Sequence, residues 1–184
     1  YEILASMPEK FAECIENGMN ILGAHIDSPR MDVKQQPLYE DGGFALLDTH
    51  YYGGVKKYQW VARPLALHGV VAKKDGAIVN VVIGEDDTDP VVGISDLLPH
   101  LGREQSKKPL SEGINGEQLN LLIGSEPLEG EESERVKLQV MKFLNEKYGL
   151  IEEDFLSAEL TIVPAGRCRE VGFDRSLLGA YGHD

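Results

Sequence analysis

The sequence predicts a mixed fold, α/β in its first part and α+β overall, on three observations. Residues 20–26 form a short apolar run rich in branched side chains, which is typical of a buried parallel strand. Residues 61–167 contain several β-type runs and one segment with helical spacing of its apolar residues. With 184 residues, of which 42% are hydrophobic, the chain is long enough to bury a core.

The first half of the chain predicts extended segments separated by turns. We expect residues 31–41 to continue extended, with Pro37 and the following glycines closing the segment. Residues 44–54 are a second apolar stretch that ends in paired glycines. A Lys-Asp-Gly turn at 74–76 joins two β-rich runs, which is the signature of a hairpin.

The second half alternates between ordered segments and a polar loop. Residues 89–101 are apolar and are expected to be ordered, whereas the polar residues 102–116 predict a mobile loop. A short strand is expected within residues 117–127, and residues 154–166 predict a return to strand.

One helix is predicted at residues 132–148. Ser133 is the expected N-cap, and Gly149 is the expected stop. The apolar residues that share helical spacing are Val136, Val140, Phe143 and Leu144.

The change of character at Val61 and near Arg167 predicts one domain inserted into another. The three parts are residues 1–60, the β-rich residues 61–167 with their single helix, and residues 168–184, which return to the first domain. The chain begins with Tyr1 and stops within an apolar segment, so we expect it to be part of a longer protein.

The acidic composition excludes some partners. Eighteen Lys and Arg against 31 Asp and Glu give a net charge of −13, which repels phosphate backbones, so no nucleic-acid partner is expected. No signal peptide and no apolar run near eighteen residues are found, so no membrane partner is expected. Cys14 and Cys168 lack CxxC spacing, which favours a reducing, cytoplasmic setting.

The motif GAHIDSPRMD follows the first apolar run. His25 and Asp27 are two residues apart, so on a strand they face the same side. Sites in parallel sheets gather beyond the carboxyl ends of strands, where the imidazole can ligate a metal and the carboxylate can orient it. The alternative is a histidine satisfied by a local hydrogen bond and an aspartate that caps the turn before Pro29.

Three blocks carry a family resemblance: AHIDSPR, HYYGG and the terminal GAYGHD. They resemble the bacterial branch of the aspartyl-aminopeptidase-type dinuclear zinc aminopeptidases, over residues 23–184. The resemblance implies a central-sheet catalytic domain, here residues 1–60 and 168–184, interrupted by an inserted β-rich dimerisation domain, residues 61–167. Dimers of such proteins build a larger tetrahedral shell, so a homo-oligomer is implied.

The resemblance also implies roles for individual residues. His25 matches a metal ligand, Asp27 matches the carboxylate that orients it, and Asp184 matches the aspartate that bridges two metals. The cofactors implied are two divalent metal ions, zinc first, with cobalt or manganese as alternatives. Metal-activated water would remove N-terminal residues from short peptide substrates. The family's catalytic base and remaining ligands lie beyond Asp184, so this chain alone is expected to be inactive.

His100 is the last candidate. In the family, a histidine of the inserted domain that resembles it reaches a neighbouring subunit's active site, which gives His100 a catalytic role; the alternative is an ordinary loop histidine. A rival function for the whole chain is a noncatalytic β-rich interaction or oligomerisation module, in which His25 and Asp27 are structural. Metal binding by a longer protein, lost on His25→Ala, separates the two functions.

Overall fold

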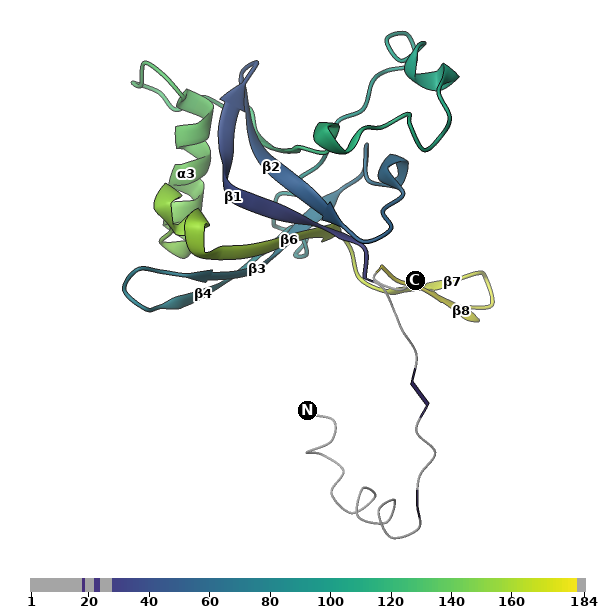
Figure 1. The fold of residues 1–184 in the computed structure, drawn as a ribbon. Helices are drawn as coiled ribbons and strands as arrows, with labels where there is room; N and C mark the ends of the chain where they lie inside the picture. Colours follow the sequence, from purple (N-terminus) through teal and green to yellow (C-terminus); the bar gives the residue numbers. More distant parts are fainter. Residues whose placement is uncertain (1–17, 19–21, 24–27, 182–184) are drawn as a thin grey trace.

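The computed structural model describes residues 18, 22–23 and 28–181 of the chain. Its main body is a six-stranded antiparallel sheet with strand order β4-β3-β6-β1-β2-β5 (Figure 1). These strands are β1 (Arg30–Asp41), β2 (Phe44–Tyr52), β3 (Leu65–Ala72), β4 (Ile78–Ile83), β5 (Leu121–Gly124) and β6 (Ala158–Pro164). Together with the helix α3 (Arg135–Tyr148) they confirm the predicted mixed fold class. The strand predicted at residues 20–26 lies largely outside the described residues.

Two hairpins build most of the sheet, and the turn signals predicted the second of them. Gly42 and Gly43 both have positive φ and join β1 to β2, with Asp41 opposite Phe44. The Lys-Asp-Gly turn joins β3 to β4 in register. The expectation that Pro37 closes its segment is wrong, because Pro37 is buried inside β1 where the pairing is irregular between Val33 and Leu38. At such an irregularity, strand pairing does not require the backbone N–H hydrogen bond that proline cannot donate.

The sheet curls until its two ends are joined by one irregular segment. Val92 exchanges backbone hydrogen bonds with Leu65 of β3, at 2.8 and 3.0 Å. The next residue, Gly93, exchanges them with Leu122 of β5, at 3.4 and 2.8 Å. This segment therefore links β3 to the β5 edge of the sheet and closes the curl. It lies within residues 89–101, which were predicted to be ordered.

The helix α3 begins at Arg135 rather than at residue 132, and Ser133 is not its cap. The residue before the helix, Glu134, has a left-handed backbone with φ of 48° and makes no capping side-chain hydrogen bond. Glu40 of β1 supplies the cap instead, because its carboxylate accepts from the backbone N–H groups of Val136 at 2.8 Å and Lys137 at 3.1 Å. A carboxylate there satisfies two free amides and complements the helix dipole. The predicted stop is confirmed, since Gly149 ends the helix with φ of 67°.

The core lies inside the curl and beneath α3. Its most completely buried side chains include Met31, Leu65, Leu119, Leu121 and Ile162, which come from strands on both sides of the curl and from the turn before β5. The helix approaches β5 closely at Gly124, where an added Cβ would lie 2.7 Å from a methyl group of Val140. None of the helices in the described part of the chain is long and apolar enough to cross a membrane.

Short elements complete the described chain. A two-stranded hairpin of β7 (Arg169–Val171) and β8 (Leu177–Gly179) stands apart from the six-stranded sheet, on the side away from α3 (Figure 1). The start of the strand predicted at 154–166 is a 3-10 helix, η4, and β6 begins only at Ala158. The 3-10 helices are η1 (Lys57–Gln59), η2 (Gln105–Lys107), η3 (Gly116–Gln118) and η4 (Glu152–Ser157).

The sheet does not break at Val61, where we placed a domain boundary. β1 pairs with β6 through Met31 opposite Ile162, and β2 pairs with β5 through Leu47 opposite Leu121. Residues 30–52 therefore share one sheet and one core with the strands of residues 61–167. The apolar faces of β1 and β2 are buried against those later strands, a nonlocal pairing that composition along the chain does not reveal.

Candidate functional site

Three of the predicted site residues, His25, Asp27 and Asp184, lie outside the described residues. The structure nevertheless describes the chain on both sides of the predicted site. Residues 28–30 follow the HID motif directly, and Tyr181 lies three positions before Asp184. The structure therefore describes residues that are close to the predicted ligands along the chain, but not the ligands themselves.

These two flanking segments meet at one end of the sheet. The rings of Trp60 and Tyr181 contact edge to face, with their centroids 5.6 Å apart. Burial raises the pKa of Tyr181, while the charge of Arg30 lowers it and that of Asp32 raises it. The start of β1 thus lies near the last described residue of the chain. We call this region, Arg30, Asp32, Tyr52, Trp60 and Tyr181, the open end.

Arg30 is held firmly as the chain enters β1. Its Nε donates to Oδ1 of Asp32 at 2.9 Å, and its guanidinium lies 4.4 Å from the centre of the Tyr52 ring. The hydroxyl of Thr161 in β6 donates to the same Asp32 oxygen at 3.2 Å. Three strands, β1, β2 and β6, therefore fix the backbone that leaves the HIDSPR block.

Chain connectivity limits how far the predicted ligands can lie from this region. Along the chain, Tyr181 is three residues before Asp184, and Arg30 is five residues after His25. The open end is the part of the described structure nearest to both along the chain.

The chemistry of the predicted donor set suits zinc. An imidazole nitrogen and carboxylate oxygens are both common zinc ligands, and a carboxylate can bridge two ions. Within residues 28–181, no group of three or more His, Cys, Asp or Glu side chains could hold a metal ion.

His100, the other predicted catalytic residue, lies far from any strand in the irregular segment before η2. It is exposed, and its neighbours Leu97, Leu98 and Leu101 are also exposed, Leu101 by 71%. The turn is closed by the backbone N–H of Leu101, which donates to Leu98 O at 2.9 Å. In the described chain, no hydrogen bond or ion pair connects His100 with another side chain. The structure thus presents His100 outward, without bringing it to the open end.

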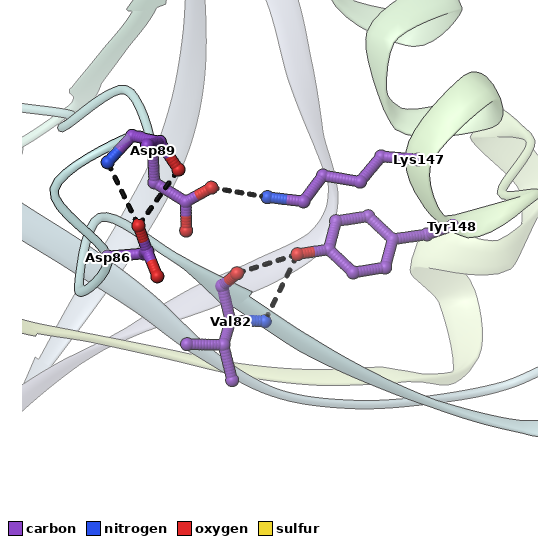
Figure 2. Close-up of polar contacts among 6 residues, drawn as sticks. Val82, Asp86, Asp89, Lys147 and Tyr148 are labelled. Carbon is purple, nitrogen blue, oxygen red and sulfur yellow. Dashed lines mark hydrogen bonds and ion pairs between the residues drawn. The ribbon is translucent and has the colours of Figure 1, made fainter.

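The best-formed polar cluster lies elsewhere, at the C-terminal end of α3 (Figure 2). The hydroxyl of Tyr148 donates to Val82 O at 2.6 Å and lies 3.4 Å from Val82 N at the outer edge of β4. Lys147 pairs with Asp89 at 2.6 Å, and this hydrogen bond raises the pKa of Lys147. The cluster ties the helix to an edge strand and satisfies its backbone, so its role is structural.

Sequence analysis did not single out Arg30, Tyr52 or Tyr181. Each nevertheless lies in one of the family blocks: Arg30 ends HIDSPR, Tyr52 lies in HYYGG, and Tyr181 lies in GAYGHD. The sequence does not show that these residues converge, because their convergence depends on pairing between strands that are 129 residues apart at Asp32 and Thr161.

The family described as Aminopeptidase I zinc metalloprotease (M18) matches residues 10–184. A probable M18 family aminopeptidase 1 of Clostridium acetobutylicum is 64% identical over 173 residues, which are 94% of this chain and 37% of that protein. Its counterpart in Thermotoga maritima is 55% identical over 170 residues, 92% of this chain and 37% of that protein. The chain thus spans about 37% of the length of these curated relatives.

Solved structures give the same result. The M18 aminopeptidase of Thermotoga maritima superposes with a TM-score of 0.83 at 54% identity, covering 91% of this chain and 37% of that one. Aminopeptidase I of Clostridium acetobutylicum gives 0.78 at 61% identity, covering 88% and 36%. The S. cerevisiae mApe1 dodecamer gives 0.52 at 16% identity, covering 85% and 33%, a likeness that shows the fold alone.

Proposed function

We propose, from the premise that this chain belongs to the Aminopeptidase I zinc metalloprotease (M18) family, that it supplies part of the active site of a metal-dependent aminopeptidase. The reaction is hydrolysis of the N-terminal peptide bond of short peptides. The metal ions would polarise the scissile carbonyl and activate water. The observation that carries the proposal is the meeting of two family blocks at the open end, where the guanidinium of Arg30 in HIDSPR lies 4.4 Å from the centre of the Tyr52 ring in HYYGG.

Each predicted residue has a distinct role in this proposal. His25 holds a metal through one imidazole nitrogen, and Asp27 accepts a hydrogen bond from the other and so fixes the orientation of the ring. Asp184 bridges two divalent ions, with zinc favoured by the family description and by the donor set. Arg30, anchored by Asp32 and Tyr52, fixes the start of β1 and with it the end of the segment that carries His25 and Asp27.

We also propose a revised domain organisation. The inserted unit starts near Arg30 rather than at Val61, because β1 and β2 share the six-stranded sheet with β3 to β6. The catalytic domain then comprises the residues before Arg30 and those from about 168 onward. This places His25 and Asp184 close to the two crossings between domains, where binding sites often form.

The assembly proposal concerns His100. We place it at a contact between subunits of a homo-oligomer, where it reaches a neighbour's site, because Leu97, Leu98 and Leu101 expose a cluster of apolar side chains around it. Exposed apolar clusters of this kind mark interaction surfaces. A cytoplasmic location, suggested by cysteine usage, is part of the same proposal.

The test uses the longer protein that continues beyond Asp184. It should hydrolyse aminoacyl anilides and short peptides, lose this activity with a chelator, and regain it with zinc, cobalt or manganese. The 184-residue chain should be inactive, because a missing general base alone costs about 10²–10⁴-fold. Chelator-sensitive turnover by the short chain would contradict the proposed division of the active site. A longer protein that neither binds metal nor hydrolyses peptides would favour the noncatalytic module.

A further inference from the structure

His100 lies on a long excursion between the segment that closes the curl and β5. Residues 95–120, which we call the arm, leave the sheet, form η2 and η3, and return to it at β5 (Figure 1). The polar part of the arm, residues 102–116, was predicted to be a mobile loop. The structure closes it with backbone hydrogen bonds such as Ser106 N to Gly102 O at 2.9 Å. The contacts that give the arm its shape also determine where His100 lies.

The turn that contains His100 is closed by one carboxylate. Oδ1 of Asp96 accepts from the side-chain amide of Gln105 at 2.9 Å and from the backbone N–H of Leu97 at 2.8 Å. Inside this closure, Leu98 O accepts from two backbone N–H groups of the turn, at 2.9 and 2.8 Å. Asp96 therefore joins the two ends of the turn, from four residues before His100 to five residues after it.

The return of the arm rests on the end of β2. Thr49 and Tyr51 are two residues apart in β2, so their side chains face the same side of the strand. The buried hydroxyl of Thr49 donates to Leu119 O at 2.6 Å. The ring of Tyr51 lies so close to Gly116 of η3 that an added Cβ there would be 2.7 Å from the ring. Lys57 of η1 lies over the same ring, 5.6 Å from its centre. Tyr51 of HYYGG, to which the proposed function gives no role, thus seats the arm.

The seated part of the arm and the turn meet at a small hollow. A cavity of about 270 Å³ is lined by Asp96 and Gln105 of the turn and by Ile114 and Gln118 of the return. Ile114 is only 6% exposed and belongs to the core, so the return is packed as well as hydrogen-bonded. A continuous set of contacts therefore runs from the end of β2 through η3 to the turn.

An imidazole carried on a long excursion can act in catalysis only if its position is set. A catalytic group must be held within about 0.5 Å of its productive geometry, and a displacement of about 1 Å that arises far from the chemistry can cost about 100-fold in rate. We infer that Asp96 and Tyr51 are positioning residues for His100. Asp96 closes the turn that presents the imidazole, and Tyr51 seats the arm on the sheet. The inference rests on the proposed function, in which His100 reaches the site of a second copy of the chain.

The first test measures hydrolysis of an aminoacyl anilide by the metal-loaded longer protein. Asp96→Ala should lower kcat/KM by about 10-fold, because the turn is no longer closed. Asp96→Asn should restore most of the rate, since its Oδ1 can still accept both hydrogen bonds. Asp87→Ala, at an exposed aspartate in the turn after β4, should retain the wild-type rate. An unchanged rate in Asp96→Ala, or an equal loss in Asp96→Asn, would overturn the inference for Asp96.

The second test concerns the seat. Tyr51→Ala should lower kcat/KM by about 10-fold, whereas Tyr51→Phe keeps the ring against Gly116 and should stay close to wild type. Phe44→Ala, which removes an exposed ring at the other end of β2, is the matched control. Equal losses in Tyr51→Ala and Phe44→Ala would mean that any damage to β2 has this effect, and would overturn the inference for Tyr51.

A double-mutant cycle shows whether both residues act through His100. When Asp96→Ala or Tyr51→Ala is added to His100→Ala, no further loss of turnover is expected, because the group that they position is already absent. Losses that multiply would show that the two residues act elsewhere and would overturn the inference. Full turnover by His100→Ala would also overturn it, while leaving metal-dependent hydrolysis by the longer protein intact.

Hydrogen exchange separates the inference from the proposed function, because it needs no turnover. The amides of Leu101 and Gly102, which donate to Leu98 O, should exchange at least about 10-fold faster in Asp96→Ala than in wild type or Asp87→Ala. Unchanged exchange, or breakdown of the oligomer in Asp96→Ala as measured by light scattering, would overturn the inference even if the longer protein is active. Faster exchange with an intact oligomer in an inactive longer protein would support the positioning of His100 by Asp96 and refute the proposed function alone.

Discussion

The two ends of the curled sheet differ in how their polar groups are satisfied. At the end covered by α3, which we call the helix end, Glu40 caps the helix, Tyr148 bonds the edge of β4, and Lys147 pairs with Asp89. At the open end, the rings of Trp60 and Tyr181 contact edge to face, and Arg30 pairs with Asp32 beneath the ring of Tyr52. The polar groups of the helix end are satisfied among the described residues, whereas the open end adjoins residues outside the described part of the chain.

This difference indicates that the helix end stabilises the fold and that the open end is the candidate for function. The helix end buries the core and uses its polar groups to lock one arrangement, which stabilises the fold. The open end brings Arg30, the last residue of HIDSPR, near Tyr181 of GAYGHD. The β7–β8 hairpin on that side exposes Phe173 fully and Leu178 by 75%, which is typical of an interaction surface.

The largest effect on function is expected from the predicted metal ligand. In the longer protein, His25→Ala should lower turnover by more than about 100-fold, because losing even a residue that only orients a ligand costs about 10–100-fold. Asp27→Asn should lower turnover by the smaller factor of about 10–100-fold. Metal content by elemental analysis and kcat/KM are the measurements. His50→Ala is the matched control, and an equal loss there would mean that the effect is not specific to the ligand.

The largest effect on stability is expected where β3 meets β6. Gly69→Ala would place a Cβ next to the backbone carbonyl of Glu159, at a position where φ is +156°. Because backbone atoms cannot yield easily, the free energy of unfolding should fall by about 3 kcal/mol or more. Gly54→Ala, with no atom within 4 Å of the added Cβ, should change it by less than about 0.5 kcal/mol. Equal effects in urea denaturation would contradict the pairing of β3 and β6.

A smaller loss is expected from the cap at the helix end. Glu40→Ala leaves the N–H groups of Val136 and Lys137 without their acceptor and should cost about 1–2 kcal/mol. Asp41→Ala, at an exposed neighbouring position, should cost little. Chemical denaturation of both variants, with helix content followed by circular dichroism, compares them. If both behave alike, α3 is not capped from β1.

The smallest effect is expected for Tyr148→Phe. The change removes the hydroxyl that bonds the backbone of Val82 and keeps the ring, so it should cost about 0.5–1.5 kcal/mol. Hydrogen exchange of the Val82 amide should accelerate, because its outward N–H loses the oxygen that lies 3.4 Å away. Unchanged exchange would show that the hydroxyl does not protect this edge of β4.

Local signals predicted much of the fold. The Lys-Asp-Gly turn predicted the hairpin of β3 and β4, and Gly149 ends α3 as expected. The start of α3 was missed because its cap comes from Glu40, 96 residues before Val136. The domain boundary at Val61 was drawn from composition, which contains no information on the pairing of β1 with β6.

Only part of the candidate site could be predicted from the sequence, for a related reason. His25, Asp27 and Asp184 lie in short motifs that can be recognised in the sequence alone. The open end draws Arg30 from β1, Tyr52 from β2 and Tyr181 from after β8. Only the fold places these residues together, so no window of the sequence could have shown the site.

The most direct test of the central claim is a zinc-loaded crystal structure of the longer protein, with the ions located by anomalous scattering. We expect an ion bound by an imidazole nitrogen of His25 at about 2.0–2.1 Å and by an oxygen of Asp184 at about 2.0–2.2 Å, beside Tyr181 and the start of β1. Zinc held elsewhere, with neither His25 nor Asp184 among its ligands, would contradict the claim that the open end carries the metal centre.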